Sequence, residues 1–356
     1  MNSVTVVLPT YKEFESLPSL IEKVEVVRDE TYPDLKLIVV DDDSDDGTEQ
    51  LIADLGKEWI ELVVRTEDRG LSPAVIAGLK IANSEYCVVM DADGSHPASA
   101  IPSMIEKLET GADFVIGSRY VDGGTTEDGW GVLRWVNSKV ATLMARPFTS
   151  TSDPMSGFLA FRRETFKKAK DLNPVGYKIG LELIVKCCCK NVAEVPIHFR
   201  TRQLGESKLT LLVQWEYLQH IVRLLRFTHP KLVSFITFGS VGLSGAVVYL
   251  IALSVTASVF DTRWLAIVLA IWIAMSWNFI WDRRFAFWYA RKRSIFSHYI
   301  GFVMVCSVGA LVNFYVTNSF QESNAIVVAG FWGVLFGSTI GIIFNYFVSR
   351  LLVFKK

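Results

Sequence analysis

Residues 86–97, YCVVMDADGSHP, join a short apolar run to two aspartates, Asp91 and Asp93, which are separated by one residue. An apolar run of about five residues that ends in polar turn residues is typical of a buried strand. Asp41 and Asp43 form a second D-x-D pair, so this pattern alone is weak. The meaning of the first pair therefore depends on what the rest of the chain places around it.

The first 202 residues alternate between strand-like and helix-like stretches. Strand-like runs occur at 5–8, 35–40, 60–65, 86–90 and 114–116. Helical stretches begin near Glu13, Thr48, Ser72 and Ala98. This alternation predicts an α/β domain with a mainly parallel sheet, in which ligands bind beyond the carboxyl ends of the strands. Four predicted strand ends continue as LPTYKE, VVDDDSDDGT, MDADGSHP and GSRY, so we expect Asp91, Asp93 and Arg119 to share one edge.

The last third of the chain has a different composition. Residues 1–230 contain 34 acidic and 26 basic residues, whereas residues 231–356 contain three acidic and ten basic residues. A bilayer is crossed by about 20 apolar residues in a helix. Uncharged stretches of suitable length occur at 232–260, 264–281, 299–320 and 324–349. We therefore expect a boundary near His229 and an all-α membrane domain of four transmembrane helices.

Basic residues flank these spans on one side. They follow the second and the fourth span, as Arg283, Arg284, Arg291, Lys292, Arg293, Arg350, Lys355 and Lys356. The loops at the other ends of the spans contain Arg263. By the positive-inside rule the basic clusters, and with them the N-terminal domain, face the cytoplasm. No stretch that resembles a secretory signal peptide precedes the first predicted strand.

The membrane part contains an internal repeat with an offset of 67 residues. SVG at 240–242 matches 307–309, and WNFIWDRRFAF at 277–287 matches FNYFVSRLLVF at 344–354. One offset serves both helices of a hairpin, which indicates a duplicated two-helix unit. The asparagine of each copy is the type of residue that forms hydrogen bonds between packed membrane helices.

The segment between the two parts is amphipathic. In TLLVQWEYLQHIVRLLRF, residues 210–227, one helix face carries Leu211, Trp215, Leu218, Val222 and Leu225. This pattern predicts a helix that lies in the membrane interface, and a helix that packs on the N-terminal domain is the alternative. The predicted division is an α/β domain at 1–209, an interfacial helix or linker at 210–229, and a membrane domain of two helical hairpins at 230–356.

Two common phosphate-binding motifs are missing from the α/β domain. The first predicted strand is followed by PTYKEFES instead of G-x-G-x-x-G, and a Walker motif is absent from the sequence. Two carboxylates at i and i+2 beyond a strand can instead hold a hard divalent cation together with diphosphate oxygens. Cys187, Cys188 and Cys189 are adjacent, a spacing unsuited to disulfide pairing or to zinc ligation. No nucleic-acid partner and no obligate protein partner is indicated.

The ordered set LPTYKE, VVDDDSDDGT, RGLSPAVIAGL, VMDADGSHP, IGSRYVDGG, DPMSGFLAFRR and RTRQLGESKL resembles glycosyltransferase family 2, which has the GT-A fold, a Rossmann-like α/β fold. Within that family the chain most resembles the dolichyl-phosphate mannose synthases, polyprenyl-phosphate glycosyltransferases, of the type with an appended four-helix membrane domain. The second part is similar to small membrane proteins associated with bactoprenol-linked glucose transfer. The resemblance covers nearly the whole chain.

The resemblance implies a role for each matching residue. The nucleotide sugar would be bound by Pro9, Tyr11, Glu13, Asp41, Asp42, Asp91, Ala92, Asp93, Arg202 and Lys208. Mg²⁺ or Mn²⁺ would be bound by Asp93, with Asp91 and Ser95. The acceptor phosphate would be bound by Arg119, Arg134 and Ser138, and the catalytic residues would be Asp91, Asp93 and Arg119. Ser95 stands where the family often has Gln as a further metal ligand, and its shorter side chain implies a contact through water.

The implied reaction is metal-dependent transfer of a hexose, foremost mannose from GDP-mannose, to dolichyl or another polyprenyl phosphate at the cytoplasmic membrane face. A phosphate acceptor is already anionic and needs no general base, and in-line attack would give a β-linked lipid phosphate sugar. Transfer of glucose from UDP-glucose is the alternative, as is a bifunctional enzyme whose membrane domain also translocates the lipid-linked sugar. A processive polysaccharide synthase would carry Q-x-x-R-W, and the corresponding GVLRW lacks the Gln.

Overall fold

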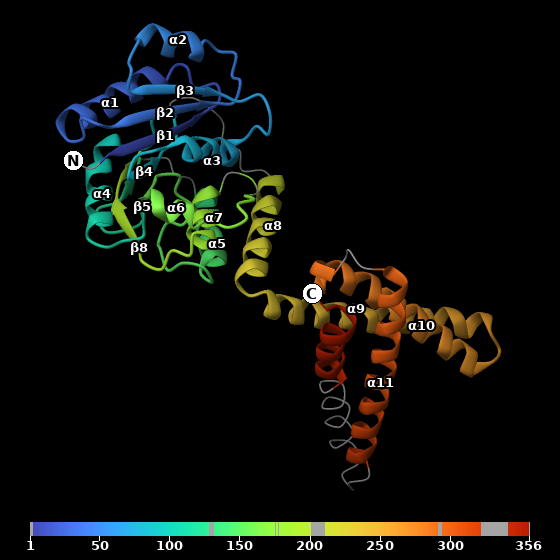
Figure 1. The fold of residues 1–356 in the computed structure, drawn as a ribbon. Coiled ribbons are helices and arrows are strands. Elements are labelled where there is room, and N and C mark those ends of the chain that lie inside the picture. Colours follow the sequence, from blue (N-terminus) through green and yellow to red (C-terminus); the bar gives the residue numbers. More distant parts are fainter. Residues whose placement is uncertain are drawn as a thin grey trace. The chain divides into compact units, whose positions relative to one another are not determined.

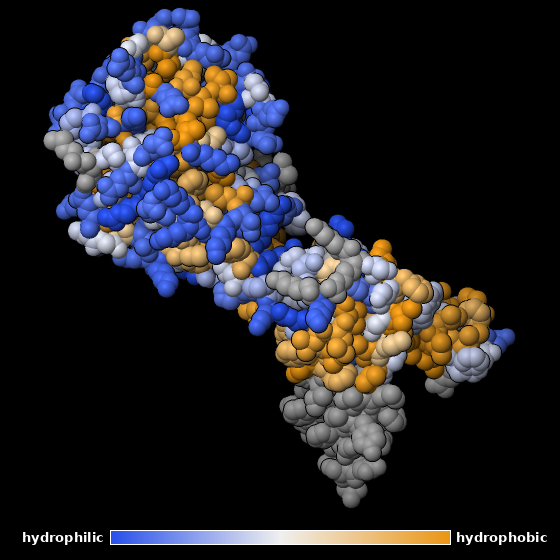
Figure 2. All heavy atoms as spheres, in the orientation of Figure 1, coloured by the Kyte–Doolittle hydropathy of each residue, from blue (hydrophilic) through white to orange (hydrophobic). Residues whose placement is uncertain are grey.

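The computed structural model describes residues 3–127, 132–174, 176, 178–200, 211–290, 294–321 and 341–355. The chain divides into two compact units, Met1–Leu224 and Leu225–Lys356 (Figure 1). On the face that Figure 2 shows, the first unit is mostly hydrophilic, whereas hydrophobic side chains dominate the described part of the C-terminal helices.

The first unit is built on a seven-stranded sheet with the strand order β3-β2-β1-β4-β7-β5-β8. Its strands are β1 (Val4–Thr10), β2 (Lys36–Asp41), β3 (Ile60–Val64), β4 (Tyr86–Val89), β5 (Phe114–Ser118), β7 (Leu159–Arg162) and β8 (Val192–Pro196). β7 runs antiparallel to β4 and to β5, and the remaining neighbours pair in parallel. The predicted α/β domain is confirmed, and its sheet is mixed, because β7 interrupts the parallel pairing. β7 and β8 are strands that the sequence patterns did not predict. β6 (Thr125–Thr126) and β9 (His198–Phe199) pair separately.

Helices cover both faces of this sheet. α1 (Leu17–Glu30), α2 (Thr48–Leu55) and α4 (Ile101–Glu109) contribute to one apolar cluster, and α3 (Leu71–Ile81) and α7 (Ile179–Lys186) contribute to the other. Because both faces are covered, central strands such as β1 are buried at every position and have no alternating pattern. Three further helical segments are η1 (Ala98–Ala100), α5 (Val132–Ala145) and α6 (Arg163–Lys167).

α8 (Leu211–Thr228) has two different apolar faces. Tyr217, Ile221 and Leu224 are buried in the first unit, and the Tyr217 hydroxyl donates a hydrogen bond of 2.8 Å to the carbonyl of Ala141. Trp215 lies on another side of the helix and is 57% exposed. The helix therefore packs on the α/β domain and still presents an apolar side chain outward.

The second unit consists of long apolar helices. They are α9 (Pro230–Val259), α10 (Arg263–Trp281) and α11 (Ile295–Gln321). Two segments, Pro230–Val259 and Trp264–Ala286, are long and apolar enough to cross a membrane. Two shorter apolar helical segments are Ile295–Val308, which is the first part of α11, and Gly341–Val353. Residues 322–340, which carry most of the fourth predicted span, lie outside the described residues. The four-span arrangement therefore stays a prediction.

The two halves of the predicted repeat share an unusual local structure. η2 (Asp282–Ala286) and η4 (Ser349–Val353) are both π-helical turns, and they lie 67 residues apart. The amides of Phe287 and Phe354 close them with hydrogen bonds of 2.8 Å to the carbonyls of Asp282 and Ser349. The two phenylalanine rings stack with centroids 4.3 Å apart. Such matched turns are what a duplicated hairpin would produce. The short helix η3 (Trp288–Ala290) follows the first turn.

Candidate active site

The loops after β1, β2 and β4 meet at one edge of the sheet. Thr10 pairs with Asp41 across β1 and β2, and β4 pairs with β1 on its other side. The hydroxyl of Ser16 connects the first loop to the D-x-D loop, because it donates to the carbonyl of Ala92 at 2.8 Å and to the carboxylate of Glu13 at 3.1 Å. The structure thus brings together Glu13, Asp41 and Ala92, which are 79 residues apart at the extremes.

A neutral histidine and a glycine hold Asp91. The Asp91 amide donates a hydrogen bond of 3.1 Å to Nδ1 of His96, which is buried and stacks on Phe158 with ring centroids 5.2 Å apart. Burial lowers the pKa of His96, which keeps Nδ1 available as an acceptor. A Cβ at Gly157 would lie 3.0 Å from both carboxylate oxygens of Asp91. A side chain at position 157 would therefore crowd the Asp91 carboxylate, and glycine avoids this contact.

Asp93 and Ser95 provide oxygen atoms in the next turn of the loop. Asp93 is 8% exposed, and one of its oxygens accepts a hydrogen bond of 3.0 Å from the Ser95 amide. The buried hydroxyl of Ser95 has no hydrogen-bond partner among the described residues. An orphaned buried hydroxyl in the same turn as the Asp93 carboxylate fits a divalent cation, since Mg²⁺ takes one or two carboxylates together with substrate phosphates and water. In the described part of the chain, no cluster of three His, Cys, Asp or Glu side chains forms an all-protein metal cage.

Arg119 forms a buried ion pair. Its Nε and one Nη donate to the carboxylate of Asp153 at 2.7 and 2.8 Å, and its amide donates to the same carboxylate at 3.1 Å. The amide of Asp153 in turn donates to Glu194 at 3.1 Å. The guanidinium lies 5.0 Å from the ring centroid of Phe199. Burial opposes the charge of Arg119, but Asp153 raises the pKa of the guanidinium above its ordinary value. Arg119 is therefore cationic and fixed in one orientation.

Asp41 and Asp42 make contacts within the loops themselves. The Asp41 carboxylate accepts hydrogen bonds from the amide and the hydroxyl of Ser44, at 2.9 and 2.5 Å. Asp42 forms an ion pair with Arg65 at 2.5 Å and accepts a bond from the Gly70 amide. Both side chains are buried. These contacts shape the loop after β2, and direct contact of either carboxylate with a nucleotide stays a prediction.

The other residues assigned from the sequence have different surroundings. Pro9 is buried in β1, and Tyr11 is 48% exposed beside it. Ser138 lies on α5, and its hydroxyl accepts a hydrogen bond of 3.1 Å from Tyr120, the neighbour of Arg119 in sequence. The backbone of Arg134 lies one turn earlier on α5, and its side chain is outside the described atoms. Arg202 and Lys208 lie outside the described residues.

Lys178 belongs to this site, although the sequence patterns did not single it out. It precedes α7, and the charges of Arg119, Asp153 and Asp91 all act on its ammonium group. Burial, followed by the Arg119 charge, lowers the pKa of Lys178 to about 8. Its one sequence signal is a lysine directly before the apolar helix IGLELIV, and surface lysines commonly occur in that context as well.

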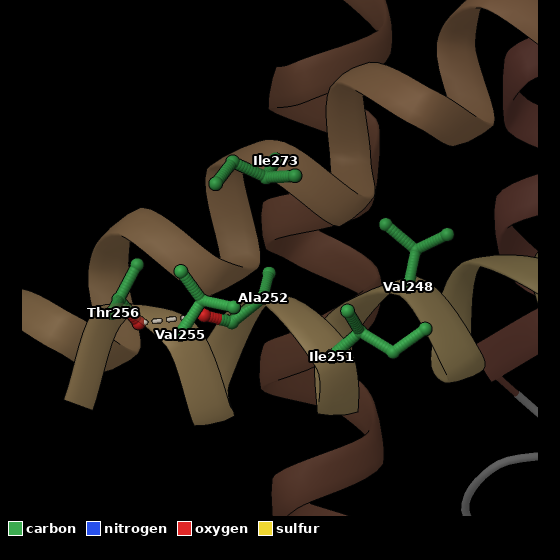
Figure 3. A pocket seen from close by; sticks show the side chains of 6 residues that line it. All are labelled: Val248, Ile251, Ala252, Val255, Thr256 and Ile273. Atoms are coloured by element: carbon green, nitrogen blue, oxygen red, sulfur yellow. Dashed lines mark hydrogen bonds between the residues drawn. The ribbon is translucent and has the colours of Figure 1, made fainter. Parts of the chain in front are cut away.

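A groove in the second unit is unsuited to this chemistry. It has a volume of about 270 Å³ and is lined by Val248, Ile251, Ala252, Val255, Thr256 and Ile273 (Figure 3). The Thr256 hydroxyl is the polar side-chain group among these residues, and it donates to the carbonyl of Ala252 at 2.9 Å. The groove therefore offers an apolar surface with no ionisable lining group.

Comparison with known proteins agrees with this arrangement. Residues 5–169 match glycosyl transferase family 2, and residues 237–354 match the GtrA/DPMS transmembrane domain. The dolichol-phosphate mannosyltransferase of Pyrococcus furiosus is 37% identical over 88% of this chain and 89% of its own. That of Saccharomyces cerevisiae is 36% identical over 67% of this chain and 93% of its own.

Among solved structures, glucosyl-3-phosphoglycerate synthase of Mycobacterium tuberculosis, in complex with Mn²⁺, UDP and phosphoglyceric acid, has a TM-score of 0.48 and 22% identity. The match covers 63% of this chain and 78% of that one. This degree of likeness carries no information on the substrate or the metal of this chain. The relative from Pyrococcus furiosus, which matches nearly the full length, and the two domain matches are decisive: the chain belongs to the dolichol-phosphate mannosyltransferase family, with a family 2 glycosyltransferase domain followed by a GtrA/DPMS transmembrane domain.

Proposed function

We propose that this chain transfers mannose from GDP-mannose to dolichyl or another polyprenyl phosphate. The main support is the 37% identity with a dolichol-phosphate mannosyltransferase over 88% of the chain. The site agrees with such a reaction, because it places the Asp91 and Asp93 carboxylates and the fixed cation Arg119 around one edge of the sheet. Oxygen ligands suit a metal-bound diphosphate, and a guanidinium suits a phosphate.

On the donor side the chain supplies oxygen ligands and a loop that holds them in place. Asp93, with Asp91 and Ser95, would hold Mg²⁺ or Mn²⁺, which when bound neutralises charge on a leaving nucleotide diphosphate. His96 and Gly157 fix the position of Asp91, which would contact the donor sugar. Pro9, Tyr11 and Glu13 would contact the nucleoside. The predicted diphosphate contacts of Arg202 and Lys208 complete this side.

On the acceptor side the chain orients an anion. A phosphate oxygen attacks the anomeric carbon of mannose, the bond from that carbon to the diphosphate breaks, and GDP leaves with the electron pair. This displacement inverts the anomeric centre and needs no general base, because the acceptor oxygen carries no proton to remove. Arg119, held by Asp153, would align the phosphate together with Arg134 and Ser138. Such alignment lowers the activation barrier, because the translational and rotational entropy is already lost on binding.

The direct test uses the purified full-length protein with dolichyl phosphate and either GDP-mannose or UDP-glucose. We expect a mannosylated lipid phosphate with GDP-mannose, no product after treatment with EDTA, and recovery when Mn²⁺ or Mg²⁺ is added back. The anomeric configuration of the product, read from its NMR coupling, should be β. Faster transfer from UDP-glucose would contradict the donor assignment, and turnover in EDTA would contradict the role of the D-x-D loop.

The membrane orientation follows from the positions of the basic clusters. We propose that the α/β domain is cytoplasmic and that the loop between α9 and α10 lies on the opposite side. Asp261→Cys, in that loop, should react with a membrane-impermeant thiol reagent only from the external face of sealed vesicles. The exposed native Cys188 of the α/β domain is an internal reference that should react only from the cytoplasmic face. Labelling of both positions from one face would contradict this topology.

Gly157→Ala should lower the transfer rate about tenfold, because the new methyl group would lie 3.0 Å from the Asp91 oxygens and displace that carboxylate by a few tenths of an ångström. Initial rates at saturating metal and donor measure the effect. Gly239→Ala is the matched control, since a Cβ there has no atom within 4 Å. Full activity of Gly157→Ala would show that the position of Asp91 is not critical.

A further inference from the structure

Lys178 lies where two parts of the site meet. A Cβ at Gly180, in the first turn of α7, would contact the side chain of Leu159 at 3.1 Å and the carbonyl of Ser156 at 3.4 Å. α7 therefore begins directly against the segment that carries Asp153 and Gly157. Asp153 is paired with Arg119, and Gly157 faces the Asp91 carboxylate. The backbone therefore places Lys178 between the proposed donor side and the proposed acceptor side of the site.

This position is fixed from several directions. The hydroxyl of Ser72, in α3, donates a hydrogen bond of 2.7 Å to the carbonyl of Gly176. The amide of Asn173 donates to Glu182 at 2.9 Å, and Glu182 bonds to His220 of α8 at the same distance. All eight residues of α7 are buried. A helix held in this way leaves its preceding residue little freedom to move away from the site.

The charges of the site call for a further cation. Arg119 and Asp153 together are neutral, and Asp91 and Asp93 add negative charge that a bound metal would offset. A phosphate monoester carries about −1.5 to −2 charges at neutral pH. The Arg119–Asp153 pair can orient such a group but supplies no net charge to attract it. The charges of Arg119, Asp153 and Asp91 all act on the ammonium group of Lys178.

We propose that Lys178 binds the phosphate of the polyprenyl acceptor and supplies the net positive charge that the Arg119–Asp153 pair lacks. The proposal rests on the proposed function and adds a residue to it. A lysine is suited to this task, since its compact charge on a flexible stem can follow a phosphate that the neighbouring arginine holds in a fixed fork. The metal and the predicted Arg202 and Lys208 contacts serve the donor diphosphate instead.

The test compares Lys178→Met and Lys178→Arg with the wild type in the full-length protein. Lys178→Met should raise the KM for dolichyl phosphate roughly 10- to 100-fold, as expected for one charge-assisted contact. The affinity for GDP-mannose with Mn²⁺, measured by calorimetry without lipid, should change less than about twofold. Lys178→Arg keeps the charge and should recover most of the loss. Lys190→Met, at an exposed position beyond α7, is the surface control.

Binding of farnesyl phosphate, measured by calorimetry, gives a readout that does not require turnover. It should weaken in Lys178→Met and recover in Lys178→Arg. Unchanged acceptor KM and unchanged farnesyl phosphate binding in Lys178→Met would overturn the proposal, as would equal weakening of donor binding. If Lys178→Met does not fold, the acceptor KM and the binding of farnesyl phosphate are measured on Lys178→Gln instead, and the same outcomes apply. A wild type that transfers no mannose would instead refute the proposed function, so the two failures are distinguishable.

Discussion

Asp93→Ala is expected to lower mannose transfer by about 10³-fold or more while the protein remains folded. Stabilisation of a leaving diphosphate by a bound cation is worth several kcal/mol, and each 1.4 kcal/mol is a factor of about ten in rate. Asp93 is the proposed main ligand, and it lies in a buried turn next to the orphaned hydroxyl of Ser95. The substitution also removes the hydrogen bond from the Ser95 amide, a cost of about 1 kcal/mol.

Initial rates over a Mn²⁺ titration measure this effect, and calorimetry with GDP shows whether metal binding is lost. The control is Asp43→Ala, in the other D-x-D sequence of the chain, whose carboxylate forms an exposed ion pair with Arg69. That variant should retain its activity and its metal response. If Asp93→Ala kept its activity with an unchanged requirement for metal, the cation would have to be bound elsewhere. If both aspartate variants lost activity together, the contrast between the two D-x-D loops would be wrong.

Asp153→Ala is expected to lower the free energy of unfolding of the α/β unit by about 3–5 kcal/mol, the usual cost of removing one partner of a buried ion pair. Asp153 has no exposed surface and accepts three hydrogen bonds from Arg119. Without it the Arg119 guanidinium would stay in a buried environment with its main counter-charge removed. The loss is therefore larger than that of an ordinary hydrogen bond.

Urea unfolding of the full-length protein in detergent, followed by tryptophan fluorescence, measures this change. Asp29→Ala is the control, because Asp29 pairs with Arg28 at the surface and exposed pairs contribute little. Double substitution Arg119→Met with Asp153→Leu should recover part of the stability but none of the acceptor affinity. If Asp153→Ala kept its stability and lost activity, Asp153 would act in the chemistry rather than in holding Arg119.

The sequence by itself determined that the N-terminal part is an α/β domain and that the C-terminal part contains long apolar helices. Continuous apolar runs such as that before Asp91 predicted buried strands, and their alternation with helical stretches predicted an α/β domain. Length and hydropathy predicted the first two membrane-spanning helices. These inferences succeed because burial leaves a local periodicity in the chain, and because the carboxyl ends of parallel strands lie at one edge wherever the strands are placed.

Only the tertiary structure decided which side chains meet at that edge. The antiparallel strand β7 lies between β4 and β5, and this placement brings the segment before it, with Asp153 and Gly157, next to Arg119 and Asp91. The position of Lys178 follows from the packing of α7 against the same segment. Strand order and helix packing depend on contacts between residues far apart in sequence, and such contacts leave no periodic signal. Local patterns therefore located Asp91, Asp93 and Arg119, while long-range packing placed Asp153, Gly157 and Lys178 beside them.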